Sequence, residues 1–135
     1  MKVGVIGAGT MGCGIAQVFA SAEGFEVVLC TGRNISVEQA QAGKDRIAKG
    51  FSKLVAKGRI EQAKADAILA KITPGLLEAA SDCDLIVESV QEDMAFKKGI
   101  FTKMQGICKK DTIFASNTSS LSLTELSQGL DRAVT

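Results

Sequence analysis

Hydrophobic residues along the chain fall into two alternating patterns. Short apolar runs that are typical of buried strands occupy 2–6, 25–29, 85–87 and 112–115, and with the short segment 71–73 before Pro74 the last of them is the fifth strand. Longer segments whose apolar residues repeat at helical spacing occupy 36–57, 61–70 and 93–108, and the last of these carries its lysines on the other face. Strands that alternate with helices require crossover connections, which make the strands parallel. The pattern therefore predicts an α/β fold with a parallel sheet.

The first strand runs directly into the motif G-x-G-x-x-G. A helix follows, with one apolar face formed by Met11, Ile15, Val18, Phe19 and Ala22. In this motif the first glycine allows a tight turn, the second lets the backbone approach a diphosphate, and the third lets the helix pack on the strand. The helix N-terminus then offers free N–H groups to the anion. This context favours a dinucleotide site in a Rossmann-type doubly wound sheet over a purely structural turn, with binding residues Gly7, Ala8, Gly9, Thr10, Met11 and Gly12.

Composition and charge narrow the class of protein. The length predicts one domain, 1–135, and the net charge of +1 comes without any block of like charges. We therefore expect a small-molecule ligand, and neither nucleic acid nor a membrane as a partner. The four cysteines form no C-x-x-C pair and histidine is absent, so no metal site is expected. The absence of a signal peptide and of a long apolar span predicts a cytoplasmic protein with reduced thiols.

Two helices are inserted after the second strand. The motif S-x-x-Q at 36–39 has the form of a capping box before the first of them, and Gly58 ends it. The second covers 61–70, so the two form an antiparallel pair that is longer than a strand crossover needs. A second capping box at 122–125 predicts a short final helix. Residues 133–135 have the pattern of the start of a sixth strand.

Four segments together carry a resemblance to a known family. They are V-I-G-A-G-T-M-G at 5–12, S-K-L-V at 52–55 followed by Gly58, D-C-D-L-I-V-E at 82–88 and A-S-N-T-S-S-L at 115–121. Over essentially its whole length the chain resembles the N-terminal domain of the 3-hydroxyacyl-CoA dehydrogenase family, most of all the bacterial 3-hydroxybutyryl-CoA members. The resemblance implies interconversion of a 3-hydroxyacyl-CoA and a 3-oxoacyl-CoA by hydride exchange with a nicotinamide. A stand-alone NAD(P)-binding sensor or regulatory module is the alternative.

The resemblance also implies roles for single residues. Ser119 would hydrogen-bond the reacting oxygen as negative charge develops on it, unless it serves only as a cap of the last helix. Glu92 and Lys97 match positions at the nicotinamide side of the cofactor and the substrate end of the cleft, with a solvated helix face as the alternative. Asn117 is assigned to the cofactor. In family members the helical pair reaches toward CoA, so the expected CoA contacts are Ser52, Lys53 and Lys57. The alternative is that these three side chains are merely solvated.

The end of the second strand departs from the pattern of NAD-binding domains. Such domains present an Asp or Glu to the ribose hydroxyls about 20 residues after the glycine loop. Here no carboxylate stands between that strand and Glu38. Thr31 and the backbone at Gly32 can hydrogen-bond a 2′-phosphate, and Arg33 can clamp it with its planar fork. We therefore expect NADP(H) to be preferred over NAD(H), the alternative being an exposed loop arginine and weakened NAD binding.

Two parts of the resembled family are missing from the chain. The family's general base is a histidine in an H-F-F-N-P stretch a few residues past position 135, and this chain has no histidine. The family's C-terminal helical domain, which closes the cleft and forms the homodimer, is also missing. We expect a fragment that binds cofactor but turns over poorly or not at all. It is also expected to self-associate through its open sheet edge or the apolar surface left uncovered.

Overall fold

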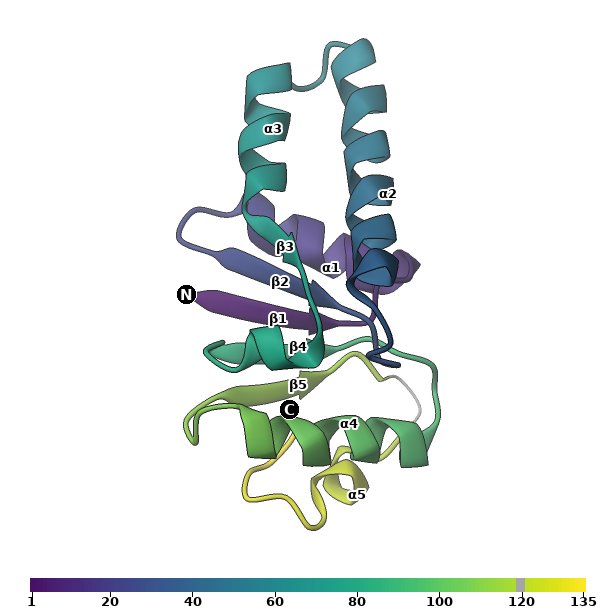
Figure 1. Ribbon diagram of the computed structural model, residues 1–135, viewed down its shortest axis with the longest axis vertical. Coiled ribbons are helices and arrows are strands. Elements are labelled where there is room, and N and C mark those ends of the chain that lie inside the picture. The colour runs from purple at the N-terminus through teal and green to yellow at the C-terminus, as the bar shows by residue number, and fades with distance from the viewer. Residues whose placement is uncertain (119–120) are drawn as a thin grey trace.

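The computed structural model describes residues 1–118 and 121–135, which form one sheet with helices on both of its faces (Figure 1). The strands are β1 (Lys2–Ile6), β2 (Glu26–Cys30), β3 (Ile72–Pro74), β4 (Leu85–Glu88) and β5 (Ile113–Ser116). The helices are α1 (Thr10–Ser21), α2 (Val37–Ala56), α3 (Gln62–Ala70), α4 (Met94–Ile107) and α5 (Leu123–Ser127), with a 3₁₀ turn η1 (Leu77–Ala80).

The strand order β3-β2-β1-β4-β5 places the first strand in the middle of the sheet. Every neighbouring pair is parallel, and Val3 of β1 lies opposite Val27 on one side and Leu85 on the other. The chain builds outward from β1 to β3 and then returns to add β4 on the opposite side. This order confirms the predicted doubly wound parallel sheet, and it creates a switch point between β1 and β4, where such sheets bind ligands.

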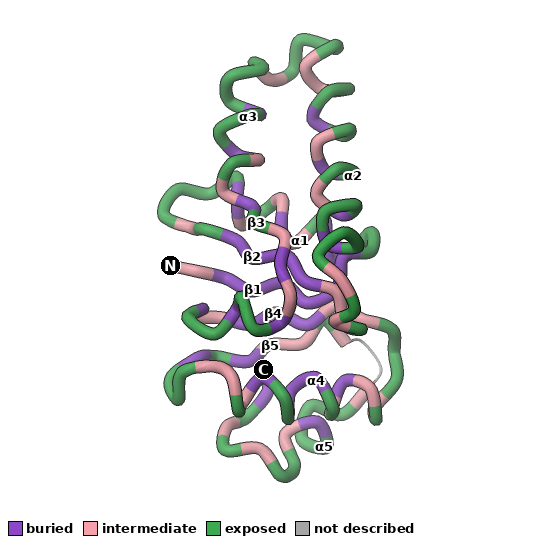
Figure 2. Tube along the Cα trace, in the orientation of Figure 1, coloured by how far each residue is buried: buried purple, intermediate pink, exposed green. Residues whose placement is uncertain are grey.

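The sheet is buried on both faces. Successive residues of β2 enter different clusters, since Val27 and Leu29 pack with α1, α2 and α3, whereas Val28 and Cys30 pack with η1 and α4. Buried positions accordingly concentrate in the strands, and the outer helix faces are exposed (Figure 2). Burial on both faces explains why the strands are nearly continuous apolar runs.

Helix α1 forms where predicted, but its predicted apolar face is only partly inward, since Ile15 and Phe19 pack against the core and other members do not. Met11 and Val18 are 61% and 70% exposed. The inward face consists of small residues, Gly12, Cys13, Ala16 and Ala20. The cause is the close approach of α1 to the loop after β1, because a Cβ on Gly12 would lie 1.7 Å from the carbonyl oxygen of Gly7. Small residues therefore occupy the positions closest to the loop, while Ile15 and Phe19 pack at the margin of the core and Met11 and Val18 face outward.

Helices α2 and α3 form the predicted antiparallel pair and stand out from the rest of the molecule (Figure 1). Gly58 ends α2 as expected, with φ of +69° and its N–H donating to the carbonyl oxygen of Val55 at 3.0 Å. The two capping boxes differ. The hydroxyl of Ser122 accepts from the N–H of Glu125 at 3.2 Å, whereas Ser36 occupies the cap position without such a hydrogen bond.

Residues 134–135 pair with the outer edge of β5, where a sixth strand was expected to begin. Val134 forms a parallel bridge with Phe114. The N–H of Thr135 donates to Phe114 and its carbonyl accepts from Ser116, both at 2.9 Å. These contacts occupy part of the edge through which self-association was expected, and self-association itself stays a prediction.

Candidate dinucleotide site

The loop after β1 lies at the switch point and is shaped by three glycines. Gly7 has φ of +121°, and a Cβ there would lie 2.2 Å from the carbonyl oxygen of Ser89 in the loop after β4. Gly12 is held against Gly7 as described above. Gly9 is different, because a Cβ there would meet no atom within 4 Å. Gly7 and Gly12 are therefore required by the fold, whereas Gly9 faces open space.

The space beside Gly9 suits an anionic group. Gly9 is the N-cap of α1, whose first-turn N–H groups have no partner within the helix. That first turn contains no acidic residue, so nothing opposes the attraction of a phosphate to the positive end of the helix dipole. The shape and charge of this loop therefore fit the diphosphate of a dinucleotide, and the binding roles of residues 7–12 stay a prediction.

Arg46 of α2 also contacts this loop, which the sequence did not indicate. Its guanidinium donates to the carbonyl oxygen of Ala8, and the thiol of Cys13 approaches the same oxygen at 3.3 Å. Helix α2 can come this close because Gly43 lacks a side chain, since a Cβ there would lie 2.8 Å from that of Ala8. A single arginine within an amphipathic helix carries no sequence signal for such a contact.

The end of β2 opens onto a cavity of about 260 Å³ lined by Gly32, Arg33, Asn34, Leu77, Ala95, Phe96, Gly99, Ile100 and Lys103. Arg33 is exposed at this cavity, and Thr31 beside it is half-buried. Asn34, with φ of +55°, fixes the loop because its side-chain oxygen accepts from the N–H of Leu77 at 2.7 Å. A Cβ on Gly32 would lie 2.8 Å from Val90, so packing accounts for this glycine.

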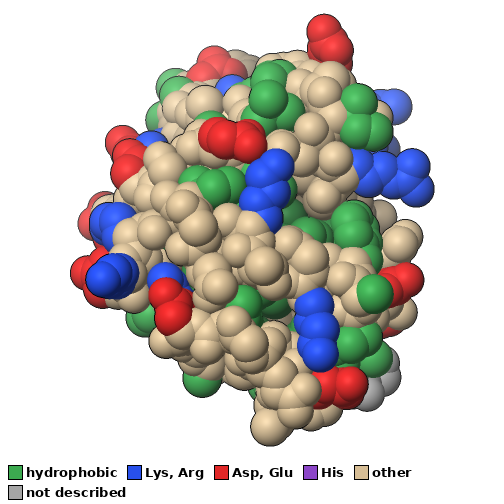
Figure 3. Space-filling model, turned by 60° about the horizontal axis from the view of Figure 1, so that its bottom comes forward, with side chains coloured by type: hydrophobic (Ala, Val, Ile, Leu, Met, Phe, Trp, Pro, Cys, Tyr) green, Lys and Arg blue, Asp and Glu red, His purple; other side chains and the backbone are tan. Residues whose placement is uncertain are grey.

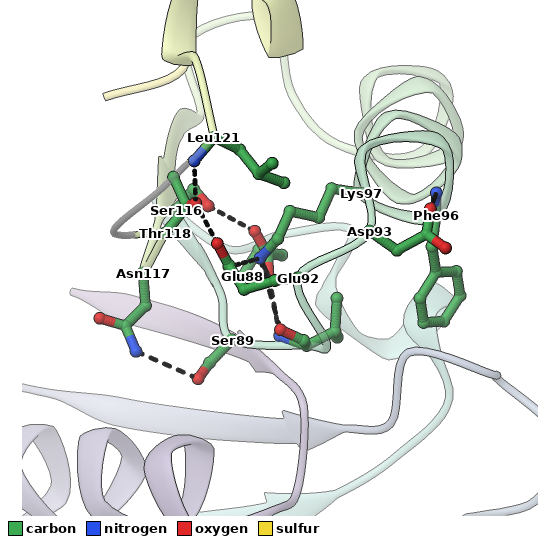
Figure 4. Close-up of polar contacts among 11 residues, drawn as sticks. Glu88, Ser89, Glu92, Asp93, Phe96, Lys97, Ser116, Asn117, Thr118 and Leu121 are labelled. Atoms are coloured by element: carbon green, nitrogen blue, oxygen red, sulfur yellow. Dashed lines mark hydrogen bonds and ion pairs between the residues drawn. The ribbon is translucent and has the colours of Figure 1, made fainter.

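A buried polar network joins the ends of β4 and β5 (Figure 4). At its centre Glu88 accepts from the ammonium of Lys97 at 2.5 Å, the N–H of Val90 at 2.7 Å and the hydroxyl of Ser116 at 2.5 Å. Lys97 also pairs with Glu92 at 3.1 Å, and Glu92 accepts from the hydroxyl of Thr118 at 2.7 Å. We call Glu88, Glu92, Lys97, Ser116 and Thr118 the Glu88 network.

Lys97 lies in a different environment from the one expected, and Glu88 is a residue of this site that was not predicted. The side chains of Lys97 and Glu88 are 0% exposed, so Lys97 does not belong to the solvated lysine face expected for α4. Because a buried charge requires a partner, Lys97 turns inward to Glu88. Glu88 belongs to the 82–88 motif but was given no role, and a carboxylate ending an apolar strand is the signal that could have identified it.

The other residues predicted to lie at the nicotinamide side belong to this network or lie next to it. The backbone N–H of Asn117 donates to the carbonyl of Glu88 at 2.8 Å, and its side-chain amide faces the hydroxyl of Ser89 at 3.5 Å. Glu92 is 40% exposed and therefore reaches the surface. Ser119 lies outside the described residues, so its assignment stays a prediction.

The three residues expected to contact CoA lie elsewhere. Ser52 and Lys53 are in the outer half of α2 and Lys57 follows its end, and all three are exposed. The hydroxyl of Ser52 donates to the carbonyl of Ala48 within the helix. The structure thus brings together the glycine loop and the Glu88 network, and it leaves these three on the projecting helical pair.

In the view that brings α4 and α5 forward, basic and acidic side chains are interspersed and form no large patch of one sign (Figure 3). Among the described residues no cluster of three or more His, Cys, Asp or Glu could hold a metal ion. No helix in that part of the chain is long and apolar enough to span a membrane. Burial raises the pKa of the Cys30 and Cys83 thiols to about 12, as expected of packing residues.

Comparisons with known proteins identify the family of this domain. The sequence model of the family described as 3-hydroxyacyl-CoA dehydrogenase, NAD binding domain, matches residues 2–134. A 3-hydroxybutyryl-CoA dehydrogenase of Clostridioides difficile is 42% identical over 133 residues, covering 98% of this chain and 46% of that protein. A second, from Bradyrhizobium diazoefficiens, is 39% identical over 132 residues, covering 97% of this chain and 44% of that protein. The chain thus spans about half the length of these relatives.

Solved structures of proteins from the same family superpose on the chain. The 3-hydroxybutyryl-CoA dehydrogenase of Escherichia coli superposes with a TM-score of 0.87 at 32% identity, covering 96% of this chain and 27% of that one. The (S)-3-hydroxybutyryl-CoA dehydrogenase of Ralstonia eutropha gives 0.85 at 35% identity, covering 93% of this chain and 44% of that one. Together with the switch-point loop and the sheet order, these matches show that the chain belongs to the 3-hydroxyacyl-CoA dehydrogenase family and corresponds to its NAD-binding domain.

Proposed function

We propose that the chain is the cofactor-binding half of a 3-hydroxybutyryl-CoA dehydrogenase that prefers NADP(H). The observation that carries this proposal is the pairing of an open phosphate cradle at Gly9 with an exposed arginine, and no carboxylate, at the end of β2. When bound, the nicotinamide supplies the site that accepts or donates the hydride. The chain's own residues bind and orient the cofactor.

The preference for NADP(H) rests on the residues after β2. An Asp or Glu at this position would repel a 2′-phosphate, whereas Arg33 can form two charge-assisted hydrogen bonds to it. Thr31 adds a hydroxyl, and the Asn34 hydrogen bond to Leu77 holds the loop in place. The adjacent cavity has Phe96 and Ile100 in its lining, which suits the flat apolar faces of an adenine.

For the substrate end we propose the roles that the family resemblance implies. We assign Ser119 to the reacting oxygen of the 3-hydroxyacyl group, and Asn117 and Glu92 to the nicotinamide side. Ser52, Lys53 and Lys57 would meet the CoA portion, because the 20-residue helix α2 spans about 30 Å and carries them away from the cofactor loop. The chain contains no histidine, so we propose that by itself it binds cofactor without efficient turnover.

Titrations with NADPH and NADH test the cofactor preference. We expect the unmodified chain to bind NADPH more tightly, and Arg33→Ala to weaken NADPH binding by about tenfold or more while leaving NADH binding unchanged. Thr31→Asp restores a carboxylate and should reverse the preference. Arg59→Ala, at the far tip of the helical pair, removes the same charge and should change neither affinity. Unchanged NADPH affinity in Arg33→Ala would rule out the phosphate clamp.

A further inference from the structure

The Glu88 network carries a net charge of −1. Glu88 accepts from an ammonium, a backbone N–H and a hydroxyl, which is the pattern of an ionised carboxylate. Glu92 accepts from Lys97 and from Thr118 in the same way. Lys97 donates to both carboxylates and to the carbonyl of Val90, as a protonated amine does. Two anions therefore share one cation at this place.

The topology places this charge in one particular half of the cofactor crevice. The glycine loop after β1 would hold the diphosphate, and the cavity beside Arg33 at the end of β2 would hold the adenosine half. The other half of a dinucleotide must then extend to the opposite side of the loop, over the ends of β4 and β5. The Glu88 network joins the ends of these two strands, and the Glu92 carboxylate is its partly exposed member.

Other charges are directed away from this half. Asp93 accepts from the N–H of Phe96 and caps α4 beside the adenosine cavity, so its carboxylate points away from the network (Figure 4). Arg46 is on the α2 side of the glycine loop, bonded to Ala8. Among the described residues, the net charge nearest the ends of β4 and β5 is thus that of the network.

We propose that the Glu88 network sets the balance between the two redox forms of the bound cofactor. The oxidised nicotinamide ring carries a positive charge, which it loses when it gains a hydride, that is two electrons and a proton, from the hydroxyacyl substrate. A fixed negative charge beside the ring stabilises the cationic form more than the neutral one. The chain therefore binds the oxidised form more tightly, relative to the reduced form, than it would with a neutral network. This inference rests on the proposed function, since it requires that the dinucleotide bind.

The size of the effect follows from Coulomb's law. For one unit charge about 10 Å from the ring at an effective dielectric constant of about 20, the ratio of the two dissociation constants changes by about tenfold. For a two-electron couple, a tenfold change in this ratio corresponds to about 30 mV in the reduction potential of the bound cofactor. Such a change is measurable from binding alone.

Two variants that shift the network charge in opposite directions test the proposal. Glu92→Gln keeps the shape of the side chain and makes the network neutral, so the ratio of Kd for the oxidised form to Kd for the reduced form should rise about tenfold. Asn117→Asp, at an exposed position on the β5 side, adds a negative charge and should lower the same ratio about tenfold. Asp82→Asn removes an equal charge at the opposite end of β4 and should leave the ratio unchanged.

The measurement follows NADPH fluorescence on binding, with NADP⁺ as competitor. The protein adds little fluorescence of its own because the chain contains neither Trp nor Tyr. General damage to the site weakens both forms together and cannot produce shifts of opposite sign. Equal ratios in all four proteins, with both forms bound, would overturn the proposal while leaving the proposed function intact. Failure of the unmodified chain to bind either form would instead overturn the proposed function, and the inference with it.

Discussion

The three glycines of the loop after β1 have different roles, and two of them are structural. Gly7 and Gly12 are required by neighbouring backbone, whereas Gly9 faces open space. The motif predicted the steric roles of Gly7 and Gly12, because both depend on local geometry that the spacing already contains, and the diphosphate role of Gly9 stays a prediction. The inward turn of Lys97 could not be predicted, since its partner Glu88 is on another element and the two meet only in the folded chain. The contact of Arg46 with Ala8 escaped prediction for the same reason.

The steric role of Gly12 is tested by a matched pair of alanine substitutions in α1. Gly12→Ala should lower the free energy of unfolding by about 2 kcal/mol or more, because its Cβ would overlap the Gly7 carbonyl. Gly14→Ala, at an exposed position with nothing within 4 Å, should raise it by about 0.5 to 1 kcal/mol through helix propensity. Urea unfolding measures both, and equal effects of the two changes would contradict the packing described here.

At the scale of elements, the chain's hydrophobic pattern located the helices and strands but not always their inner faces. The inward side of α1 was found only in part, because periodicity marks the large apolar residues, whereas close packing on β1 selects small ones. The helical pair was found because its own caps and breaks define it, as at Gly58. Registers between strands depend on distant pairs such as Val3 with Leu85, and local patterns do not specify these.

Asp84 links neighbouring elements and makes their stability depend on pH. Its carboxylate accepts from the ammonium of Lys109 at 2.7 Å and the N–H of Lys2 at 2.9 Å, which lowers the pKa of Asp84. Because the folded pKa is lower than the unfolded one, the stabilisation is complete above about pH 4 and is lost as pH falls through the folded value.

We therefore expect the free energy of unfolding, measured with urea, to decrease from about pH 5 to about pH 3. Asp84→Asn should show a smaller decrease over the same range, because it no longer has this carboxylate to protonate. Asp111→Asn, which removes an exposed carboxylate on the nearby turn, provides the comparison. If the decrease in Asp84→Asn equals that of the unmodified chain, these hydrogen bonds do not contribute as described.

At the scale of the whole molecule, the order of the strands brings separate motifs together at one edge of the sheet. The glycine loop, the Arg33 cavity and the Glu88 network follow β1, β2 and β4, and they meet at the same edge because these strands are parallel. The α/β pattern predicted the parallel sheet that brings these strand ends together. The three residues proposed to contact CoA lie in the outer half of α2 and just after its end, so we expect a long ligand to approach from that side.

The most direct test of the account is a calorimetric titration of the unmodified chain and of Gly9→Ala with NADPH. We predict that the unmodified chain binds one equivalent, and that Gly9→Ala keeps the same thermal unfolding midpoint but binds at least about tenfold more weakly. The added methyl group would occupy the space of the diphosphate without touching the protein. Equal affinity of the two proteins would contradict the account, because the cofactor could not then lie against the loop after β1.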